Sequence, residues 1–324
     1  MTRLLKNYRG QRPPQILTIE PWLREGDNPI AAAPNARGGR LVPWIVLRYG
    51  SIWSRLRHWG LIKNQLKGSL AEALESAKSI RQNTLPPRTI MNEAEKLELV
   101  ALLSGLGFAG WGKTIVRPEI LFSRARILYS DALVITMEMD KSSMETAHSG
   151  TAYQEIFRTY HELGKVVNQL AGWFRERGFG AQAGPAIGGD VNYVALAQEA
   201  GLGFIGRNGL LIGPHAGPRI RLAAVFTSVQ NLPAGDLQET AWGRYFCKKC
   251  GACIRACPAA AIYQEALPIE GDSAGNPVYI DHTRCVKPFS RQFGCSICIK
   301  VCPFSQSGWE KIKMAKNKEQ GVER

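Results

Sequence analysis

The sequence predicts an α+β protein made of two unlike parts, and three observations support this prediction. Helical and strand patterns are mixed between residues 91 and 235, which is typical of one layered α+β domain. All eight cysteines lie beyond residue 246. From about residue 240 onward, short loops and cysteines replace the regular patterns. With 324 residues, of which 45% are hydrophobic, the chain is long enough for two medium domains with buried cores.

The first 90 residues show few structural signals. Pro13-Pro14, Gly38-Gly39 and Pro86-Pro87 interrupt them, and the stretch from 52 to 80 between these breaks fits one or two helices. We predict that residues 1–90 form an N-terminal extension that packs on the main body. The sequence assigns no chemistry to this extension.

Residues 91–235 read as the main α+β domain. Asn92 can accept a hydrogen bond from a free backbone N–H group, and Glu95 completes a capping box, so a helix begins here. Gly105 and Gly107 end this helix. The later patterns predict strands at 132–137, 210–212 and 222–226, a long amphipathic helix at 151–177 and a short helix at 191–200.

The composition narrows the partners and the compartment. A net charge of +14 favours nucleic acid, an acidic electron carrier or a phosphorylated cofactor, although a merely basic surface explains it equally well. No apolar stretch approaches the roughly 20 residues of a membrane helix, and the first residues resemble no secretory or twin-arginine signal. The first 246 residues contain no cysteine, which fits a reducing compartment. We therefore expect a cytoplasmic protein.

The cysteines follow the spacing of an iron–sulfur protein. Cys247 begins the run C-x2-C-x2-C-x3-C-P, which is typical of bacterial ferredoxins. The first three thiolates can take three corners of one [4Fe–4S] cubane, while the fourth reaches a second cluster. The other motif runs from Cys295 to Cys302-Pro303, and its remaining cysteine, Cys285, lies ten residues upstream of Cys295. The two motifs together predict Cys247, Cys250, Cys253 and Cys302 as ligands of cluster 1, and Cys257, Cys285, Cys295 and Cys298 as ligands of cluster 2.

Two other interpretations of the cysteines fit the spacing less well. Zinc sites usually combine two C-x2-C pairs, which leaves the two C-x3-C-P endings unexplained. Clusters with a purely structural role are the second alternative, although two clusters in one module usually relay electrons. We predict a ferredoxin-like domain with two [4Fe–4S] clusters at 236–310, followed by a basic tail at 311–324.

Two glycine motifs match the dinucleotide-binding pattern G-x-G-x-x-G, one from Gly105 to Gly110 and one from Gly201 to Gly206. That pattern needs a strand before it and a helix after it. Each motif here follows a helix-like segment instead. We therefore predict no nucleotide site, and expect the glycines to turn the chain or to let the backbone approach another group closely.

The most distinctive segments are AGLGFIGRNGLLI, from Ala200 to Ile212, and GPRIR, from Gly217 to Arg221. Together with the shortened second cysteine motif, they resemble the corrinoid reductive dehalogenases, a family related to the epoxyqueuosine reductases that act on tRNA. The resemblance covers roughly residues 92–305. It implies a nitroreductase-like, cobalamin-binding domain at 91–235, ahead of the bacterial-ferredoxin-like domain with its two [4Fe–4S] clusters.

The resemblance also implies how the cobalamin is held. The cofactor would be base-off and would lack a protein ligand to cobalt, which agrees with the absence of a D-x-H-x-x-G motif at any of the five histidines. Residues implied at the corrinoid are Gly188, Gly189, Asp190, Gly201, Gly203, Gly206, Arg207, Asn208 and Gly209.

Two catalytic residues follow from the same resemblance. Tyr160 takes the place of the proton donor, and Arg221 that of the basic residue beside it, where a cation would favour the charged form of a tyrosine. Tyr160 also fits a plain core tyrosine, since it lies on the apolar stripe of the helix at 151–177, and Arg221 fits a surface or phosphate-binding arginine. Gly189 stands where the family has an asparagine that holds the tyrosine.

The two branches of the resemblance differ at a few positions. The epoxyqueuosine branch uses an aspartate at the position of Ile187, and Asp190 is nearby but out of register. The pair Arg207-Asn208 matches the dehalogenase form, because the tRNA-modifying branch usually has Lys-His there.

The resemblance therefore predicts a cytoplasmic reductase that passes electrons through two [4Fe–4S] clusters to a base-off corrinoid. The corrinoid would cleave a carbon–halogen or similar bond of a small molecule, and a low-potential donor such as ferredoxin or flavodoxin would supply the electrons. An epoxyqueuosine-reductase-like enzyme acting on tRNA is an alternative that the +14 charge favours and Ile187 disfavours. A non-catalytic electron carrier with two [4Fe–4S] clusters is another. The substrate, the donor, the oligomeric state and the role of residues 1–90 stay open.

Overall fold

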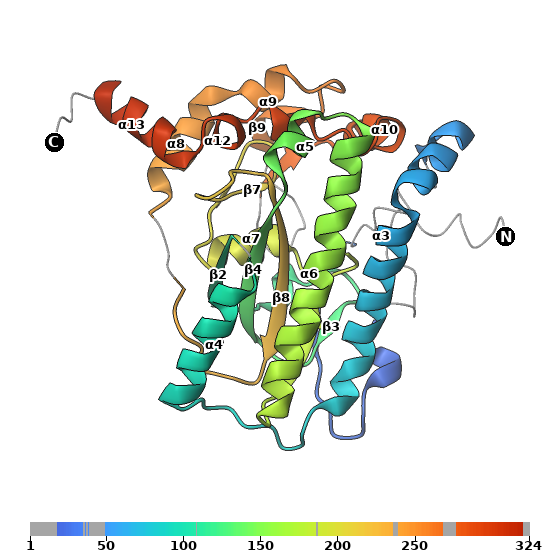
Figure 1. Cartoon of the computed structure of the whole chain (residues 1–324), viewed down its shortest axis with the longest axis vertical. Coiled ribbons are helices and arrows are strands. Elements are labelled where there is room, and N and C mark those ends of the chain that lie inside the picture. Colours follow the sequence, from blue (N-terminus) through green and yellow to red (C-terminus); the bar gives the residue numbers. More distant parts are fainter. Residues whose placement is uncertain are drawn as a thin grey trace.

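A four-stranded antiparallel sheet crosses the centre of the molecule, with the cysteine-rich C-terminal segment at one end (Figure 1). The computed structural model describes residues 18–34, 36, 38, 49–107, 109–185, 187–235, 239–267 and 277–319. The strands follow the order β2 (Gly110–Ile115), β4 (Asp131–Glu138), β8 (Ile220–Thr227) and β5 (Ala181–Gly184).

The two inner strands, β4 and β8, are apolar on both faces. Successive side chains of a strand point to opposite sides of the sheet, so an uninterrupted apolar run indicates a strand covered twice. Leu133 and Val134 of β4 are neighbours in the chain, and neither is exposed to solvent. Leu133 belongs to the apolar core on one face of the sheet, and Val134 to the core on the other.

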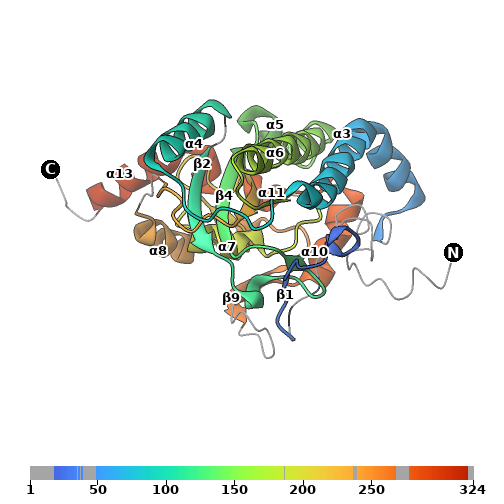
Figure 2. The same cartoon turned by 90° about the horizontal axis from the view of Figure 1, so that it is seen from below.

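Helices cover both faces of the sheet. Figure 2 shows α4 (Glu93–Gly105), α6 (Gly150–Glu176) and α3 (Ile52–Lys78) side by side on one face, and α7 (Tyr193–Glu199) on the other. α4 begins with the predicted capping box, because Asn92 Oδ1 accepts from Glu95 N and Glu95 Oε2 accepts from Asn92 N, both at 2.9 Å. The helices predicted at 151–177 and 191–200, and the strands predicted at 132–137 and 222–226, are confirmed to within two residues.

The sequence did not indicate the edge strands β2 and β5, because glycines interrupt their side-chain pattern. Gly112 in β2 has a clear structural reason. A Cβ atom at this position would lie 2.5 Å from the carbonyl oxygen of Ala200, so only glycine permits the close approach of β2 to the end of α7. A pattern search for apolar alternation misses such a strand, since the deciding contact is with a distant segment.

The N-terminal part of the chain contributes a core helix. α3 packs along α6, and Gly164 permits this approach, because a Cβ atom there would lie 2.9 Å from Cβ of Glu72. Asn168 of α6 joins the pair, accepting a hydrogen bond from Ser76 Oγ at 2.8 Å and donating one to the carbonyl of Glu72 at 3.0 Å. The domain boundary at residue 90 stays a prediction, and residues 1–17 and 39–48 of this segment lie outside the described residues.

Shorter elements complete the main body. β1 pairs with β3 and β6 pairs with β7, both in antiparallel fashion. The bounds are η1 (Glu20–Trp22), β1 (Ile30–Ala31), η2 (Ser79–Gln82), η3 (Pro118–Ile120), β3 (Arg126–Ile127), α5 (Lys141–Glu145), β6 (Phe204–Ile205) and β7 (Leu211–Ile212).

The cysteine-rich segment folds over one end of the sheet, where aromatic side chains fasten it to the main body. Trp242, Phe304 and Trp309 form one apolar core with Phe204 of β6, and the ring centres of Phe204 and Phe304 are 6.0 Å apart. The elements are α8 (Ala241–Cys250), α9 (Ala252–Arg255), β9 (Ile262–Leu267), β10 (Val278–Ile280), α10 (His282–Arg291), α11 (Ile297–Lys300), α12 (Pro303–Gln306) and α13 (Trp309–Glu319).

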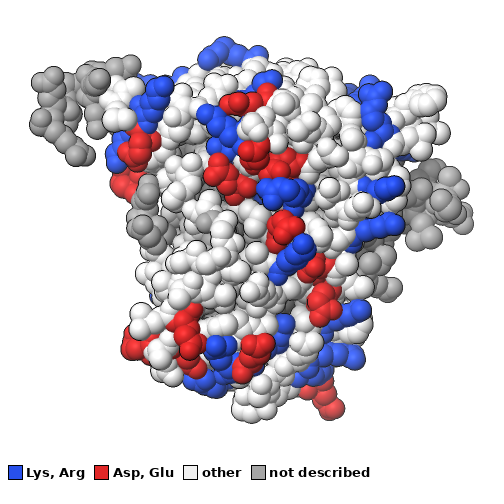
Figure 3. Space-filling model, in the orientation of Figure 1, with Lys and Arg blue, Asp and Glu red and all other residues white. Residues whose placement is uncertain are grey.

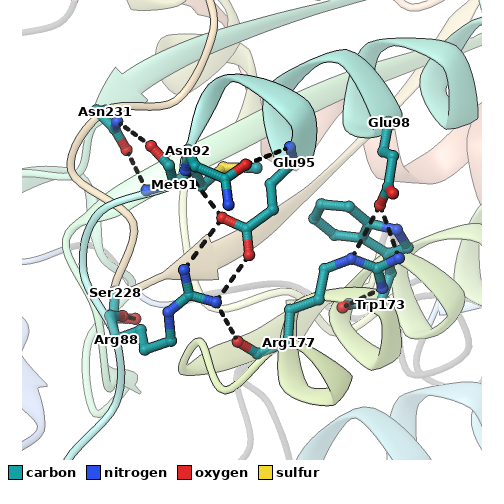
Figure 4. A network of polar contacts seen from close by, with 9 residues as sticks. All are labelled: Arg88, Met91, Asn92, Glu95, Glu98, Trp173, Arg177, Ser228 and Asn231. Carbon is teal, nitrogen blue, oxygen red and sulfur yellow. Dashed lines mark hydrogen bonds and ion pairs between the residues drawn. The ribbon is translucent and has the colours of Figure 1, made fainter.

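A polar network closes the opposite end of the molecule (Figure 4). Arg88 holds the carboxylate of Glu95 with two hydrogen bonds, at 2.7 and 3.1 Å, and donates a third to the carbonyl of Arg177 at 2.9 Å. Arg177 in turn binds Glu98 at 2.9 Å. The hydrogen bonds from Arg88 lower the pKa of Glu95, and the network ties the start of α4 to the end of α6.

The surface shows no single charged stripe on the face drawn in Figure 3, where basic and acidic side chains are interspersed. Within the described part of the chain, no helix is both long and apolar enough to span a bilayer.

Candidate iron–sulfur centres and active site

Four thiols from the two cysteine motifs surround one pocket. Cys247 and Cys250 lie on the last turn of α8, and Gly251 turns the chain with a φ of +61° so that α9 brings Cys253 back. Cys302 comes from the other motif, at the start of α12. The pocket holds about 300 Å³, counting its open mouth, and its other walls include Asn208, Ile212, Phe246 and Phe304. The structure thus brings together the four thiols that the sequence assigned to cluster 1.

The remaining four thiols form a second group. Burial raises the pKa of the Cys298 thiol, and the neighbouring charges of Cys285 and Cys295 raise it further. Cys253 and Cys257 act on Cys298 in the same sense. The structure therefore brings together the second predicted ligand set, and Cys253 connects the two groups because it belongs to the first set and still lies near Cys298.

The thiols fit iron–sulfur clusters in charge as well as in position. Burial raises the pKa of Cys302 to about 12 and that of Cys253 to about 11, so these thiols stay protonated until a positive centre binds. Among the described residues, no three His, Cys, Asp or Glu side chains converge closely enough to hold a single metal ion. Thiolates that hold a cubane bind its separate corners, so they need not converge on one point.

Tyr160 and Arg221 meet at the side of the sheet covered by α6. Arg221 stands near the start of β8, opposite Met137 of β4 in the sheet register, and Tyr160 lies halfway along α6. The guanidinium carbon of Arg221 lies 4.6 Å from the centre of the Tyr160 ring. Nε of Arg221 is buried and has no hydrogen-bond partner among the described residues. The pair therefore offers a half-buried hydroxyl, a fixed cation and an unused donor to a bound group.

The Tyr160 ring belongs to an apolar region that reaches the second thiol set. Cys298 and Ile299 of the cysteine-rich segment lie in this region, as does Phe157, whose ring centre is 5.7 Å from that of Tyr160. Ile187 lies there too and is 3% exposed. The site around Tyr160 is thus apolar at the position where the epoxyqueuosine branch would place an aspartate.

The segment from Gly201 to Gly209, which we call the glycine loop, has a role in the fold at several of its predicted cofactor positions. Arg207 donates a hydrogen bond to the carbonyl of Lys248 at 2.9 Å, and Asn208 lines the pocket of cluster 1. A Cβ atom at Gly203, where φ is +156°, would lie 2.3 Å from the carbonyl oxygen of Ile212. Gly206 also faces Ile212, and Gly209 faces Ile280. These residues therefore join the main body to the cysteine-rich segment, and their contact with a corrinoid stays a prediction.

Gly188, Gly189 and Asp190 form a second group of predicted cofactor residues, away from the glycine loop in sequence. Gly189 faces the ring of Tyr193, where a Cβ atom would clash. Asp190 is 4% exposed and accepts a hydrogen bond from Gln182 Nε2 at 3.4 Å. Packing within the chain thus explains Gly189 and the burial of Asp190.

The two glycine motifs meet in a second pocket of about 360 Å³. Gly110 from the first motif and Gly201 from the second both line it, together with Thr136 and His215. Gly105 ends α4 and Gly110 begins β2, so a helix precedes the motif and a strand follows it. This order is the reverse of a dinucleotide-binding turn.

Sequence reasoning missed His58, which α3 places beside the second thiol set. The imidazole is 2% exposed, and its Nε2 accepts a hydrogen bond from Phe293 N at 3.2 Å. Phe293 begins four consecutive residues with positive φ, which end at Ser296 and include Cys295. Burial, followed by the charge of Arg57, lowers the pKa of His58, so the ring stays neutral and can accept. A lone histidine in the first 90 residues gives no sequence signal for this contact.

Comparison with known proteins agrees with this arrangement. Residues 246–305 match the family model of the 4Fe-4S double cluster binding domain. A tetrachloroethene reductive dehalogenase from Desulfitobacterium hafniense is 30% identical over 227 residues, which cover 67% of this chain and 39% of the relative. An epoxyqueuosine reductase from Listeria monocytogenes is 29% identical over 132 residues, or 36% of this chain and 31% of the relative.

A solved reductive dehalogenase, whose structure suggests a mechanism for B12-dependent dehalogenation, shares the fold. The two superimpose with a TM-score of 0.64 at 18% identity, over 97% of this chain and 47% of that chain. Fold and thiol sets thus define an α+β iron–sulfur protein with a C-terminal 4Fe-4S double cluster binding domain, as predicted. The chain is a homologue of the reductive dehalogenases and, over a shorter stretch, of the epoxyqueuosine reductases. It spans less than half the length of the reductive dehalogenases that it matches.

Proposed function

We propose that this protein is an iron–sulfur, cobalamin-dependent reductase of the reductive dehalogenase type. One observation supports this function above the others: the Tyr160–Arg221 pair lies in the same apolar region as Cys298, a predicted cluster ligand. A proton donor, a fixed cation and an electron source are thus close together. A reductive cleavage needs these three components in one place.

The cofactor completes the proposal. Bound near Tyr160, a base-off cobalamin would supply a low-valent cobalt centre able to break a carbon–halogen bond. The residues that we assign to holding it are those of the resemblance, from Gly188 to Asp190 and from Gly201 to Gly209. The buried Nε of Arg221 fits a bound group in this region, because it is a donor without an acceptor among the described residues.

The chain's own residues supply the proton and balance the charge. Conversion of an organohalide to the reduced product takes two electrons and one proton and releases one halide ion. In the proposed mechanism the Tyr160 hydroxyl donates this proton to the carbon that loses the halide. The Arg221 guanidinium, which lies over the ring, then stabilises the tyrosinate until solvent returns a proton. The apolar surroundings, including Ile187, keep bulk water from the reacting carbon.

The substrate class, the electron donor and the cellular compartment follow from the same proposal. A small organohalide is the substrate class, which the names of the dehalogenase relatives support. A low-potential carrier such as ferredoxin or flavodoxin supplies the electrons. We place the protein in the cytoplasm, a reducing compartment, since its eight free thiols must remain available to iron.

A second candidate function is modification of tRNA in the manner of epoxyqueuosine reductases. The net charge of +14 and the similarity to that family favour it. The buried Ile187 counts against it, since this position lacks the aspartate that the resemblance assigns to that branch. A non-catalytic electron carrier is the third candidate, and it would need neither Tyr160 nor Arg221.

The test begins with protein reconstituted anaerobically, first with iron and sulfide and then with cobalamin. We expect an absorption spectrum with contributions from both cofactors, and chloride release from tetrachloroethene with reduced methyl viologen as donor. Tyr160→Phe should lower turnover by about 100-fold or more, because a positioned proton donor contributes at least that much. Tyr129→Phe is the matched control, since it removes a hydroxyl beside the apolar core on the other face of the sheet.

Three results would contradict the proposal in different ways. Clusters that form without any cobalamin binding would favour the electron carrier. Full turnover by Tyr160→Phe would eliminate the tyrosine as proton donor. Reduction of an epoxyqueuosine-containing tRNA stem loop, with no chloride release from organohalides, would favour the tRNA enzyme.

A further inference from the structure

The elements that bear the first thiol set present a strongly basic surface. Between residues 240 and 264 the chain has four basic residues and no acidic one. All four are exposed, and we call them the basic collar: Arg244, Lys248, Lys249 and Arg255. They lie on α8 and α9, at the end of the molecule away from the Arg88 network (Figure 1).

The collar residues alternate in the chain with the cysteines that line the open pocket of cluster 1. Lys248 and Lys249 stand between Cys247 and Cys250 in the sequence, and Arg255 follows Cys253 by two residues. Cys247, Cys250 and Cys253 line the pocket, so exposed basic residues adjoin these cysteines in the chain. A molecule bound to the collar would therefore be within a short distance of the cluster ligands.

Two contacts hold the collar in position. Lys249 Nζ lies 4.4 Å from the centre of the Tyr245 ring, and this tyrosine is 52% exposed. Arg255 donates a hydrogen bond to the carbonyl of Cys250 at 3.0 Å. The surface thus combines fixed cations with an exposed aromatic ring, a combination common where proteins meet charged protein partners.

The positions of the two clusters also indicate that electrons enter near the basic collar. Cys298 of the second set lies in the apolar region of Tyr160, so cluster 2 is the one next to the proposed reaction site. α9, which carries Cys253 of the first set, packs against α11, which carries Cys298, so the two clusters are neighbours. The first set lines a pocket with an open mouth, and the exposed basic residues of the collar are neighbours of its cysteines in the chain. A partner bound to the collar would therefore reach cluster 1 first.

We propose that the basic collar is the docking surface for an acidic one-electron carrier protein, and that electrons enter the molecule at cluster 1. This inference rests on the proposed function, whose electrons it supplies. In each encounter the reduced carrier loses one electron and cluster 1 passes from the 2+ to the 1+ state, with no bond made or broken. Because the cations lie on the two helices that carry the cysteines of a redox pocket, an electron-carrying partner fits this surface better than a nucleic acid does.

The test measures cluster reduction alone, without cobalamin or organohalide, so that its failure is separate from a failure of dehalogenation. Full-length protein with both clusters is mixed anaerobically with reduced flavodoxin, and bleaching of the cluster absorption is followed in time. We expect the double variant Lys248→Glu/Lys249→Glu to lower the second-order rate constant at least tenfold at low salt. The difference should shrink as salt rises. Reduction by dithionite should keep the wild-type rate.

Two further variants make the result decisive. Lys287→Glu makes the same charge change on α10, beside Cys285 of cluster 2, and should stay within about twofold of the wild-type rate. Lys248→Gln/Lys249→Gln should also slow the flavodoxin reaction, but by a smaller factor than the glutamate variant. If the glutamate variant loses iron, the glutamine variant provides the test of the docking surface.

Four outcomes would overturn the proposal. One is a flavodoxin reaction that neither salt nor the collar variants affect. Another is a larger loss in Lys287→Glu than in the collar variants, which would place electron entry at cluster 2. The third is a glutamine variant that reacts at the wild-type rate while the glutamate variant is slow with dithionite as well. The last is an unchanged flavodoxin rate with lost tRNA binding, which would make the collar a nucleic-acid surface.

Discussion

The guanidinium carbon of Arg221 lies 4.6 Å from the centre of the Tyr160 ring. This contact joins the middle of α6 to the start of β8, on the side where Cys298 approaches. A cation over the face of an aromatic ring is worth about 0.5–2 kcal/mol, more when it is desolvated. The relationship therefore fixes both side chains, and it gives the tyrosine a permanent positive neighbour.

Replacement of Arg221 tests this relationship. Arg221→Met keeps much of the apolar stem but removes the charge, and we expect turnover of tetrachloroethene to fall by about 100-fold, the usual loss for one electrostatic partner of a transition state. Arg221→Lys should recover part of the loss, because it keeps the charge without the planar stack. The measurement is the turnover number at saturating substrate. Unchanged turnover in Arg221→Met, with normal iron and cobalamin content, would remove Arg221 from the mechanism.

The cysteine pairing predicts the behaviour of double variants. Cys302→Ala should lose cluster 1 only, so that iron content falls by about half. Adding Cys250→Ala should cause no further loss, because both thiols line the same pocket. Adding Cys285→Ala instead should remove the second cluster as well, since this thiol neighbours Cys298.

The readouts for this prediction are iron content and the electron paramagnetic resonance signal of the reduced protein. Retention of one cluster in Cys302→Ala/Cys285→Ala, together with loss of both in Cys302→Ala/Cys250→Ala, would reverse the pairing.

Local spacing explains what the sequence could predict. The capping box of Asn92 and Glu95 lies within one helical turn, so the residues that decide the structure are neighbours in the chain. The same is true of Cys247 and Cys250, which share the last turn of α8. The placement of Cys302 with the first set needed only the symmetry between two short motifs. Patterns of this length can be recognised from the sequence alone because they depend little on the rest of the fold.

Contacts between distant segments explain what the sequence could not predict. His58 and Phe293 are joined by a hydrogen bond across most of the chain, and no local pattern marks either residue. Gly110 and Gly201 share a pocket although each motif, taken alone, resembles a nucleotide site. Tyr160 was placed by family likeness, since its helical stripe fits a core residue equally well. Such roles depend on tertiary packing, which spacing alone does not contain.

The Glu95 carboxylate predicts a pH dependence of stability at the end remote from the cysteines. The hydrogen bonds from Arg88 lower the pKa of Glu95 below the usual value of 4.5. The carboxylate therefore contributes to the free energy of unfolding above pH 4.5, and this contribution is lost as the pH falls through the lowered pKa. We expect Glu95→Gln to reduce the free energy of unfolding by less than about 1 kcal/mol at pH 7, because this pair is near the surface.

Urea unfolding at pH 7 and at pH 3 measures this difference. The gap between wild type and Glu95→Gln should narrow at the lower pH, while iron content stays equal. A gap of the same size at both pH values would show that Glu95 acts through its capping geometry and not through its charge.

The hydrogen bond from Phe293 N to His58 predicts a role for α3 in setting cluster 2. The bond restrains the first of four consecutive residues with positive φ, a conformation that is costly for the three that are not glycine, Cys295 among them. In His58→Ala, the freed N–H group and water can approach the cluster sulfur atoms. Both stabilise the more negative reduced state, so we expect the reduction potential of cluster 2 to rise. His58→Gln keeps an acceptor and should restore part of the wild-type reduction potential.

Leu66→Ala weakens the packing of α3 in the same apolar region without touching the loop, and should leave the reduction potential of cluster 2 unchanged. A redox titration followed by electron paramagnetic resonance measures the potential directly. If Leu66→Ala shifts it as much as His58→Ala does, the effect comes from loosening of α3, and the specific role of the imidazole is excluded.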